Sequence, residues 1–327
     1  MTEPRLHATV DIREEVVREL FASHTLTAVG VTPMSGGIIN TNIRVDCTDR
    51  PYLLRIYQAE RSIDEIEFEL SALRRLHDGG IPVQRPVDPV ENRPRELEGR
   101  LYTILTFIEG EIMDEAEVSP AIGKQMGRFL GDMQNALEGF VPAGQKARCD
   151  GDFIDNLVRE AVGALHARGE VPLAESITAR WQQAREPFLA DELPLGLVHA
   201  DLYPGNVILR NGSVVGVIDF DDAYYGTQFF DVAIAAMEFA FRGDVDLDVE
   251  IVRDFVSAYE ATQAKIDNNM LLDAMLLNCF RFFAYTLPLT LEADEPAETN
   301  VYARRISLFS DSKFRRDMLH RLGRRCP

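Results

Sequence analysis

One stretch of this 327-residue chain, from residue 197 to residue 222, constrains its fold more than any other. Three apolar runs in it are separated first by a polar loop that contains Pro204-Gly205 and then by a turn at Asn211-Gly212. Apolar runs divided by turn residues of this kind predict short strands joined by tight connections. The polar residues of the stretch are therefore expected at strand ends.

Three of those polar residues, Asp201, Asn206 and Asp219, are of the types that a phosphoryl-transfer site requires. A carboxylate can accept the proton of an attacking hydroxyl, while an amide and a second carboxylate can hold Mg²⁺ through hard oxygens. The spacing His-x-Asp-x-x-x-x-Asn begins at His199, and an Ile-Asp-Phe triplet places Asp219 thirteen residues after Asn206. The stretch indicates phosphoryl transfer.

The length, charge and cysteine content of the chain narrow the class of protein. At about 150 residues per domain, the length favours two domains. The formal net charge of -19 argues against binding to nucleic acid, because neutralising phosphates requires an excess of Lys and Arg. The four cysteines lack Cys-x-x-Cys spacing, so neither a zinc site nor a disulfide framework is indicated.

The sequence predicts neither a secretory signal nor a membrane span. The first residues lack a basic segment that leads into an apolar one. The longest apolar patch, at 229–241, is interrupted by Asp231 and Glu238 and is too short to cross a bilayer. We therefore expect a cytoplasmic protein that binds no membrane, while its oligomeric state stays open.

The N-terminal part of the chain alternates predicted strands and helices, after a lead-in helix within residues 1–25. The Gly36-Gly37 pair could present N–H groups to phosphate oxygens, or could form an ordinary hairpin turn. Arg55 stands in an apolar strand and needs an anion, either a nucleotide phosphate or a glutamate of the helix predicted at 63–77. A surface pair at a strand edge is the alternative for Arg55.

The pattern changes from strands to helices near residue 106, after an apolar strand at 100–108. The basic tail at 304–325 favours a solvated terminal helix, with contact to a membrane or an anionic partner as the alternative. The helices predicted after the change are 121–137, one or two within 153–189, 231–241, 248–259 and 271–287.

The central stretch resembles the aminoglycoside phosphotransferase and choline kinase superfamily, the small-molecule branch of the protein-kinase-like fold. In that superfamily the catalytic loop has the sequence His-Gly-Asp-x-x-x-x-Asn, and the metal-binding strand has Ile-Asp-Phe or Ile-Asp-Trp. This chain differs from the pattern only by Ala200 in place of Gly. The resemblance implies a two-lobed α+β fold. A small β-rich nucleotide-binding lobe would span residues 1–105, and a larger, mainly helical catalytic and substrate-binding lobe would span residues 106–327.

The resemblance also implies a role for each residue of the central stretch. Asp201 would be the catalytic base or the residue that orients the hydroxyl, and Asn206 and Asp219 would be the Mg²⁺ ligands. His199 and Asp231 would brace the loop, although a plain helix cap is the alternative for Asp231.

In the first lobe the resemblance implies residues that bind ATP, and it is less specific there. Arg55 stands where the superfamily usually has Lys, so the charge is kept but the geometry of its contacts changes. The residues implied are Gly36, Gly37 and Asn40 in the phosphate-covering loop, Arg55 with its partner Glu69, and Thr106, Phe107 and Ile108 in the hinge that holds adenine.

The leading hypothesis is an ATP- and Mg²⁺-dependent kinase that acts on a hydroxyl of a small amine-bearing metabolite of the homoserine, choline or aminoglycoside type. Within the superfamily, the sequence looks most like homoserine-kinase-like and stress-response-kinase-like members. Asp221 and Asp222 would suit a cationic substrate, or could simply be solvated acids. The alternatives are a Ser/Thr protein kinase of the same fold and a nucleotide-binding regulator without catalysis.

Overall fold

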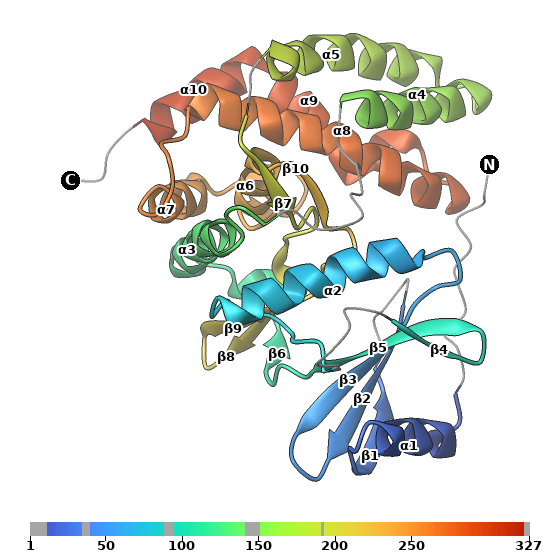
Figure 1. Ribbon diagram of the computed structural model, residues 1–327. Coiled ribbons are helices and arrows are strands. Elements are labelled where there is room, and N and C mark those ends of the chain that lie inside the picture. The colour runs from blue at the N-terminus through green and yellow to red at the C-terminus, as the bar shows by residue number, and fades with distance from the viewer. Residues whose placement is uncertain (1–11, 35–39, 88–93, 141–150, 191–192, 324–327) are drawn as a thin grey trace.

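The computed structural model describes residues 12–34, 40–87, 94–140, 151–190 and 193–323 (Figure 1). Gly36 and Gly37, which the sequence places in a phosphate-covering loop, lie outside the described residues. The predicted two-lobed α+β fold is confirmed: an antiparallel sheet forms one lobe, and helices form most of the other.

The first lobe is a five-stranded antiparallel sheet with the strand order β1-β2-β3-β5-β4 and a helix on either side. Helix α1 packs through Val17 and Phe21 on the face that carries Leu54, while Leu53 on the opposite face belongs to the core that contains α2. Because side chains alternate along β3, Arg55 shares the face of Leu53 and points toward α2. The elements of this lobe are α1 (Glu14–Ser23), β1 (Ala28–Pro33), β2 (Thr41–Cys47), β3 (Pro51–Ile56), α2 (Ile63–Asp78), β4 (Arg95–Leu97) and β5 (Arg100–Thr106).

Helix α2 lies between the large sheet and the helical lobe (Figure 1). Its start is fixed by a capping box, in which Ser62 accepts a hydrogen bond from the Glu65 N–H and the Glu65 carboxylate accepts one from the Ser62 N–H. Its buried positions include Glu69, which is 1% exposed. A buried carboxylate requires a cation or donors beside it, and the strand residue Arg55 supplies the cation.

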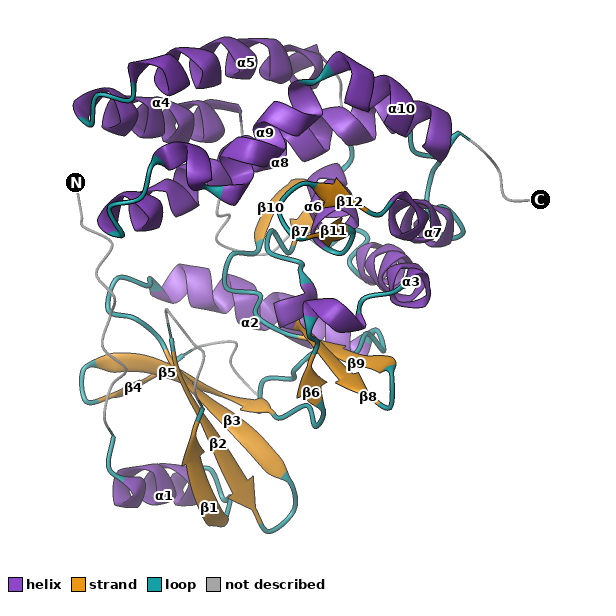
Figure 2. Ribbon diagram, turned by 180° about the vertical axis from the view of Figure 1, so that it is seen from behind, coloured by secondary structure: helices purple, strands orange, loops and turns teal. Residues whose placement is uncertain are grey.

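A small three-stranded sheet, β6-β8-β9, lies between the large sheet and the helices (Figure 2). Strands β7 and β10 form a separate two-stranded antiparallel sheet, in which residue 198 lies opposite residue 224. These short strands carry the central stretch of the sequence at the junction of the two lobes. The elements are β6 (Glu111–Ile112), β7 (Leu195–Val198), the 3₁₀ turn η2 (Pro204–Asn206), β8 (Val207–Arg210), β9 (Ser213–Val217) and β10 (Tyr224–Thr227).

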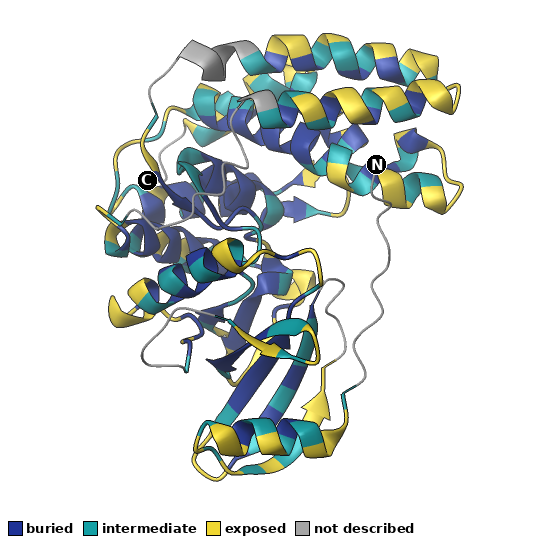
Figure 3. Cartoon of the chain, turned by 45° about the vertical axis from the view of Figure 1, so that its right-hand side comes forward, coloured by how far each residue is buried: buried dark blue, intermediate teal, exposed yellow. Residues whose placement is uncertain are grey.

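The helices of the second lobe pack around one apolar core, which their buried faces form together (Figure 3). Helix α3 approaches α7 closely because α3 carries glycines four residues apart: a Cβ at Gly127 would lie 2.1 Å from the Phe255 carbonyl oxygen. The helices are α3 (Pro120–Ala136), α4 (Gly151–Ala167), α5 (Val171–Ala190), α6 (Phe229–Glu238), α7 (Val249–Tyr259), α8 (Asn268–Glu292), α9 (Val301–Ser310) and α10 (Ser312–Leu322), with 3₁₀ turns at Glu115–Glu117 and Ala297–Thr299 and a two-residue hairpin of β11 (Phe241–Arg242) and β12 (Asp246–Leu247).

Within the described residues, α8 is the one helix whose length and composition would allow it to cross a membrane. In this fold 67% of its most apolar window is buried inside the protein. It packs against α4, α6 and α9 and so serves as the central helix of the second lobe.

The basic C-terminal tail differs from the single solvated helix that its charge pattern predicts. It forms α9 and α10, and Arg305 is buried with its Nη1 atom 3.0 Å from Glu238 Oε1. Arg315 pairs with Asp273 of α8 at 2.5 Å. These cations neutralise acids of the same lobe, which the charge run in the sequence did not reveal.

Candidate active site

The loop between β7 and η2 carries Asp201, and contacts to the backbone fix its path. The His199 and Ala200 N–H groups donate to the buried carboxylate of Asp231, with N···O distances of 2.6 and 2.8 Å. Arg281 of α8 donates to the Ala200 carbonyl oxygen at 2.7 Å. Ala200 has φ +72°, a left-handed conformation that costs an L-residue about 1–2 kcal/mol. The superfamily's glycine at this position would adopt that conformation without strain.

His199 uses both ring nitrogens within the loop. The Asp201 N–H donates to Nδ1 at 3.3 Å, and Nε2 lies 3.1 Å from the Ile218 carbonyl oxygen. Because an N–H must donate and a carbonyl must accept, the neutral tautomer with the proton on Nε2 satisfies both contacts. The ring also packs on Phe220, with centroids 4.4 Å apart. These contacts favour the supporting role predicted for His199 over acid-base chemistry.

The Asn206 side chain holds the Asp201 carboxylate in place. Its Nδ2 donates to the Asp201 carbonyl oxygen at 2.8 Å and to Asp201 Oδ2 at 3.1 Å. With the amide nitrogen committed to Asp201, the amide oxygen Oδ1 receives no hydrogen bond from the described residues. A hard oxygen is thereby presented beside the carboxylate.

Across the junction of the lobes, Arg55 contacts three carboxylates. Its Nη1 lies 3.2 Å from Glu69 Oε1, 3.4 Å from Asp219 Oδ1 and 3.0 Å from Asp221 Oδ1. Its Nε donates to Asn42 Oδ1 at 3.3 Å. The ion pair expected with Glu69 is present, and the two aspartates of the second lobe join it. Asp219 is held in a left-handed backbone conformation, with φ +67°.

Asp221 links the two lobes. Besides Arg55, it accepts a hydrogen bond from Asn40 Nδ2 at one carboxylate oxygen and one from Arg61 at its carbonyl oxygen. The Arg61 guanidinium also lies 3.7 Å from Asp221 Oδ1. The sequence suggested Asp221 and Asp222 as substrate contacts, whereas the partners of Asp221 all come from the first lobe.

The crowding of acids shifts their pKa values. Burial, together with the charges of Asp222 and Asp219, raises the pKa of Asp201 to about 6. Burial and Asp221 raise the pKa of Glu69 to about 8. Burial likewise raises the pKa of Asp219, against the opposing effect of Arg55. In all three groups the largest cause of the raised pKa is burial, which disfavours the charged carboxylate.

The hinge, residues 106–108, already uses part of its backbone within the protein. The Thr106 N–H donates to the Arg85 carbonyl at 2.8 Å, and the Phe107 N–H donates to the Pro51 carbonyl at 3.3 Å. The Ile108 N–H has no backbone acceptor among the described residues. Of the N–H groups in the segment predicted to hold adenine through its backbone, those of Thr106 and Phe107 are therefore already used within the protein.

Comparison with known proteins identifies the family. Residues 30–266 match the phosphotransferase enzyme family, APH. The chain belongs to this family. It is 29% identical to the homoserine kinase of Methylobacillus glycogenes over 70% of each chain, and 30% identical to that of Rhodopseudomonas palustris over 68% of this chain and 67% of the other. A structure of the amicoumacin kinase hAmiN shares the fold, with a TM-score of 0.68, 17% identity and 94% of each chain covered.

This phosphotransferase contains two site residues that motif spacing did not predict, Arg61 and Arg281. Arg61 follows β3 in a polar loop, where nothing in the local pattern distinguishes it from a surface cation. Arg281 gave a usable signal, because it is a cation in the middle of the apolar helix α8 and is only 4% exposed. A buried arginine needs an acceptor, and here the acceptor is the Ala200 carbonyl oxygen in the loop that carries Asp201.

Proposed function

We propose that this phosphotransferase transfers the γ-phosphate of ATP to a hydroxyl group of a small amine-bearing metabolite, with homoserine as the first candidate. The observation that carries the proposal is the convergence of Asp201, Asn206 and Asp219, which supply one carboxylate for the hydroxyl and two hard oxygens for a metal. The relatives named homoserine kinase support the choice of acceptor. A cytoplasmic location fits this role.

The residues present fit Mg²⁺ as the metal. Asn206 presents an amide oxygen, Asp219 presents a partly exposed carboxylate, and these are hard ligands. The described residues contain no group of three or more His, Cys, Asp and Glu that could hold a metal alone. Mg²⁺ commonly takes one or two protein carboxylates and completes its shell with phosphates and water. When bound, it would neutralise charge on the phosphates of ATP.

The protein's own residues would act mainly by positioning. Asp201, held by Asn206, would accept a hydrogen bond from the acceptor hydroxyl and take its proton late in a loose transition state. Asp231 and Arg281 would fix the loop that carries Asp201. His199, with both ring nitrogens engaged, would support the loop and would not exchange protons with the substrate.

The first lobe would hold the nucleotide. Arg55, paired with Glu69, would place a guanidinium beside the phosphates. The hinge at Thr106, Phe107 and Ile108 would contact adenine through its remaining backbone groups. The amicoumacin kinase structure contains AMP-PNP and Ca²⁺, which supports use of a nucleotide and a divalent cation in this family.

An amine on the acceptor would suit the acidic character of the site. The charge of Asp222 bears directly on Asp201, and the chain as a whole carries a net charge of -19. A Ser/Thr protein kinase and a non-catalytic nucleotide-binding regulator remain the competing hypotheses.

The test is phosphate transfer from ATP with Mg²⁺ to L-homoserine, choline, ethanolamine, an aminoglycoside and a generic protein substrate, followed by ³¹P NMR. L-2-aminobutyrate, which is homoserine without the hydroxyl, is the matched control. We expect a new phosphomonoester signal with L-homoserine and none with 2-aminobutyrate. Transfer to the protein substrate would favour the protein kinase. Stabilisation by ATP without any acceptor-stimulated turnover would favour the regulator.

A further inference from the structure

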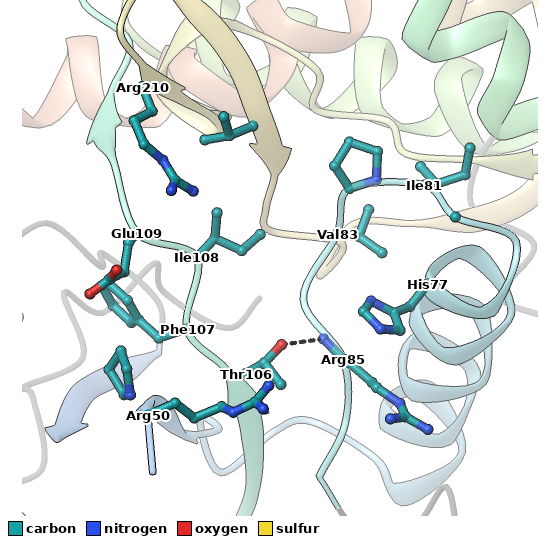
Figure 4. A pocket seen from close by; sticks show the side chains of 14 residues that line it. Arg50, His77, Ile81, Val83, Arg85, Thr106, Phe107, Ile108, Glu109 and Arg210 are labelled. Atoms are coloured by element: carbon teal, nitrogen blue, oxygen red, sulfur yellow. Dashed lines mark hydrogen bonds between the residues drawn. The ribbon is translucent and has the colours of Figure 1, made fainter. Parts of the chain in front are cut away.

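A cavity of about 550 Å³ lies between the hinge and the segment 80–85, which leads away from α2 (Figure 4). The β8–β9 hairpin closes it through Arg210 and Val215. Asn40, Arg55, Asp201, Asn206 and Asp219 are all absent from its lining. We call it the hinge-side cavity: it shares the predicted hinge residues Thr106, Phe107 and Ile108 with the candidate active site and none of the residues expected to contact the metal or the acceptor.

The hinge-side cavity gathers cations in a chain whose net charge is -19. In Figure 4, Arg210 and Arg50 stand on one side, and His77 and Arg85 stand on the other. The one carboxylate in the lining is Glu109.

Of the acids near this cavity, Glu109 pairs outside the lining, whereas Asp49 pairs with the lining residue Arg50. Glu109 lies 3.8 Å from Arg44, which is not part of the lining. Asp49, in an adjoining cavity of about 280 Å³, lies 3.8 Å from Arg50 and accepts a hydrogen bond from Tyr52. Within the described part of the chain, no carboxylate forms an ion pair with His77, Arg85 or Arg210. The guanidinium groups of Arg85 and Arg210 are therefore not engaged in ion pairs with the described residues, and a bound anion would pair with them.

The size and the walls of the cavity favour a small molecule over a macromolecule. A volume of about 550 Å³ falls within the range of small-molecule sites, about 300–1,000 Å³. Val83, Phe107, Ile108 and Val215 provide apolar contact area beside the cations. Guanidinium groups match phosphate oxygens in pairs, and apolar walls suit the organic part of an ester.

The cavity is also joined to the hinge by backbone contacts. The Thr106 N–H donates to the Arg85 carbonyl at 2.8 Å, and the Arg85 N–H donates to Thr106 Oγ1 at 2.9 Å. A ligand that binds the Arg85 side chain therefore contacts a residue whose backbone is hydrogen-bonded to both the backbone N–H and the side-chain hydroxyl of Thr106. Any effect on the hinge must be reciprocal, because two coupled sites change each other's affinity by the same factor.

We propose that the hinge-side cavity binds a phosphorylated small molecule, a phosphate monoester, and that its occupancy changes the affinity of the hinge for nucleotide. The phosphate is held by arginines of the lining, and the organic part lies against its apolar walls.

The test is calorimetric titration of the full chain, in EDTA, with O-phospho-L-serine, glucose 6-phosphate, AMP and inorganic phosphate. The double variant Arg85→Gln/Arg210→Gln is compared with Arg13→Gln/Arg316→Gln, which removes the same charge at two exposed arginines outside the cavity. We expect at least one ester to bind the wild type and the control alike, and to bind the cavity variant at least about tenfold more weakly. Inorganic phosphate is expected to bind more weakly than that ester.

The titration is repeated with saturating AMP-PNP. The ester is expected to bind still, with its Kd changed by the same factor by which the ester changes the Kd of AMP-PNP. Failure of every ester to bind, equal binding to the cavity variant, or competitive displacement by AMP-PNP would overturn the site. Unchanged affinities would overturn the coupling to the hinge.

Discussion

The loop that carries Asp201 and the Arg55 cluster both lie at the junction of the two lobes, but different kinds of contact hold them. The loop is fixed through its backbone, by the Asp231 carboxylate and the Arg281 guanidinium. Arg55 itself is held through side chains, because it contacts the carboxylates of Glu69, Asp219 and Asp221.

The difference teaches where substitution should matter. Contacts to backbone N–H and C=O groups do not depend on the residue that carries them, so the loop tolerates Ala200 in place of glycine. The cluster depends on the length and fork of one guanidinium. Lysine, the residue usual in the superfamily, could not make the same set of contacts. We expect chemistry to fail when the loop changes and nucleotide affinity to fail when the cluster changes.

The largest effect is expected for Asp201→Asn. An amide cannot accept the hydroxyl proton, so kcat should fall by about 10²–10⁴-fold. Steady-state kinetics with the acceptor identified by ³¹P NMR measures the loss. Asp246→Asn, at an exposed position of β12, is the matched control and should keep wild-type kcat. A kcat within threefold of wild type in Asp201→Asn would mean, at roughly 0.7 kcal/mol of barrier, that Asp201 does not take part in the chemistry.

Asp231→Ala should have the largest effect on stability. It leaves two buried backbone N–H groups without an acceptor, and each costs about 1–3 kcal/mol. We expect the free energy of unfolding to fall by about 3 kcal/mol in urea denaturation. Asp231→Asn keeps one acceptor oxygen and should lose less. Equal stability of the wild type and Asp231→Ala would show that the loop does not need this brace.

Arg55→Lys should have a smaller effect, on nucleotide affinity. The ammonium keeps the charge but loses the separate Nε contact to Asn42, and one such hydrogen bond is worth about 1.4 kcal/mol. The KM for ATP should rise about tenfold with kcat nearly unchanged. Arg18→Lys, at an exposed pair on α1, is the control. A lysine variant that binds ATP more tightly would show that Arg55 is not adapted to its cluster.

Ala200→Gly should have the smallest effect. Relief of the left-handed conformation gains about 1–2 kcal/mol, and loss of one buried methyl group costs about 0.8 kcal/mol. We expect a net stabilisation of up to about 1 kcal/mol in urea denaturation, with kcat preserved. A clear loss of stability would mean that the methyl contacts with Val198 and Tyr224 outweigh the strain.

The sequence predicted the parts of this fold and site that depend on local pattern. The strand around Arg55, the helix with Glu69 and the spacing of Asp201 and Asn206 follow from periodicity and turn residues. The resemblance to the superfamily implied the pairing of Arg55 with Glu69, whereas the local pattern left a phosphate or a glutamate of the following helix as alternatives.

The remaining contacts join residues that are far apart in the chain and leave no local pattern. Arg61 meets Asp221 across 160 residues, and Arg305 meets Glu238 across 67. From sequence alone, a run of basic residues such as the C-terminal tail is predicted to be solvent-exposed, because its acidic partners are distant in the chain. Only the fold shows that these cations are paired inside the second lobe.

The measurement that tests the central claim most directly is calorimetric titration of AMP-PNP with Mg²⁺ into the wild type, Asp201→Asn and Arg55→Met. If the loop carries the chemistry and the cluster holds the nucleotide, Asp201→Asn should bind within about twofold of wild type although it transfers no phosphate, and Arg55→Met should bind at least about tenfold more weakly. The account would be contradicted by loss of binding in Asp201→Asn together with wild-type binding in Arg55→Met.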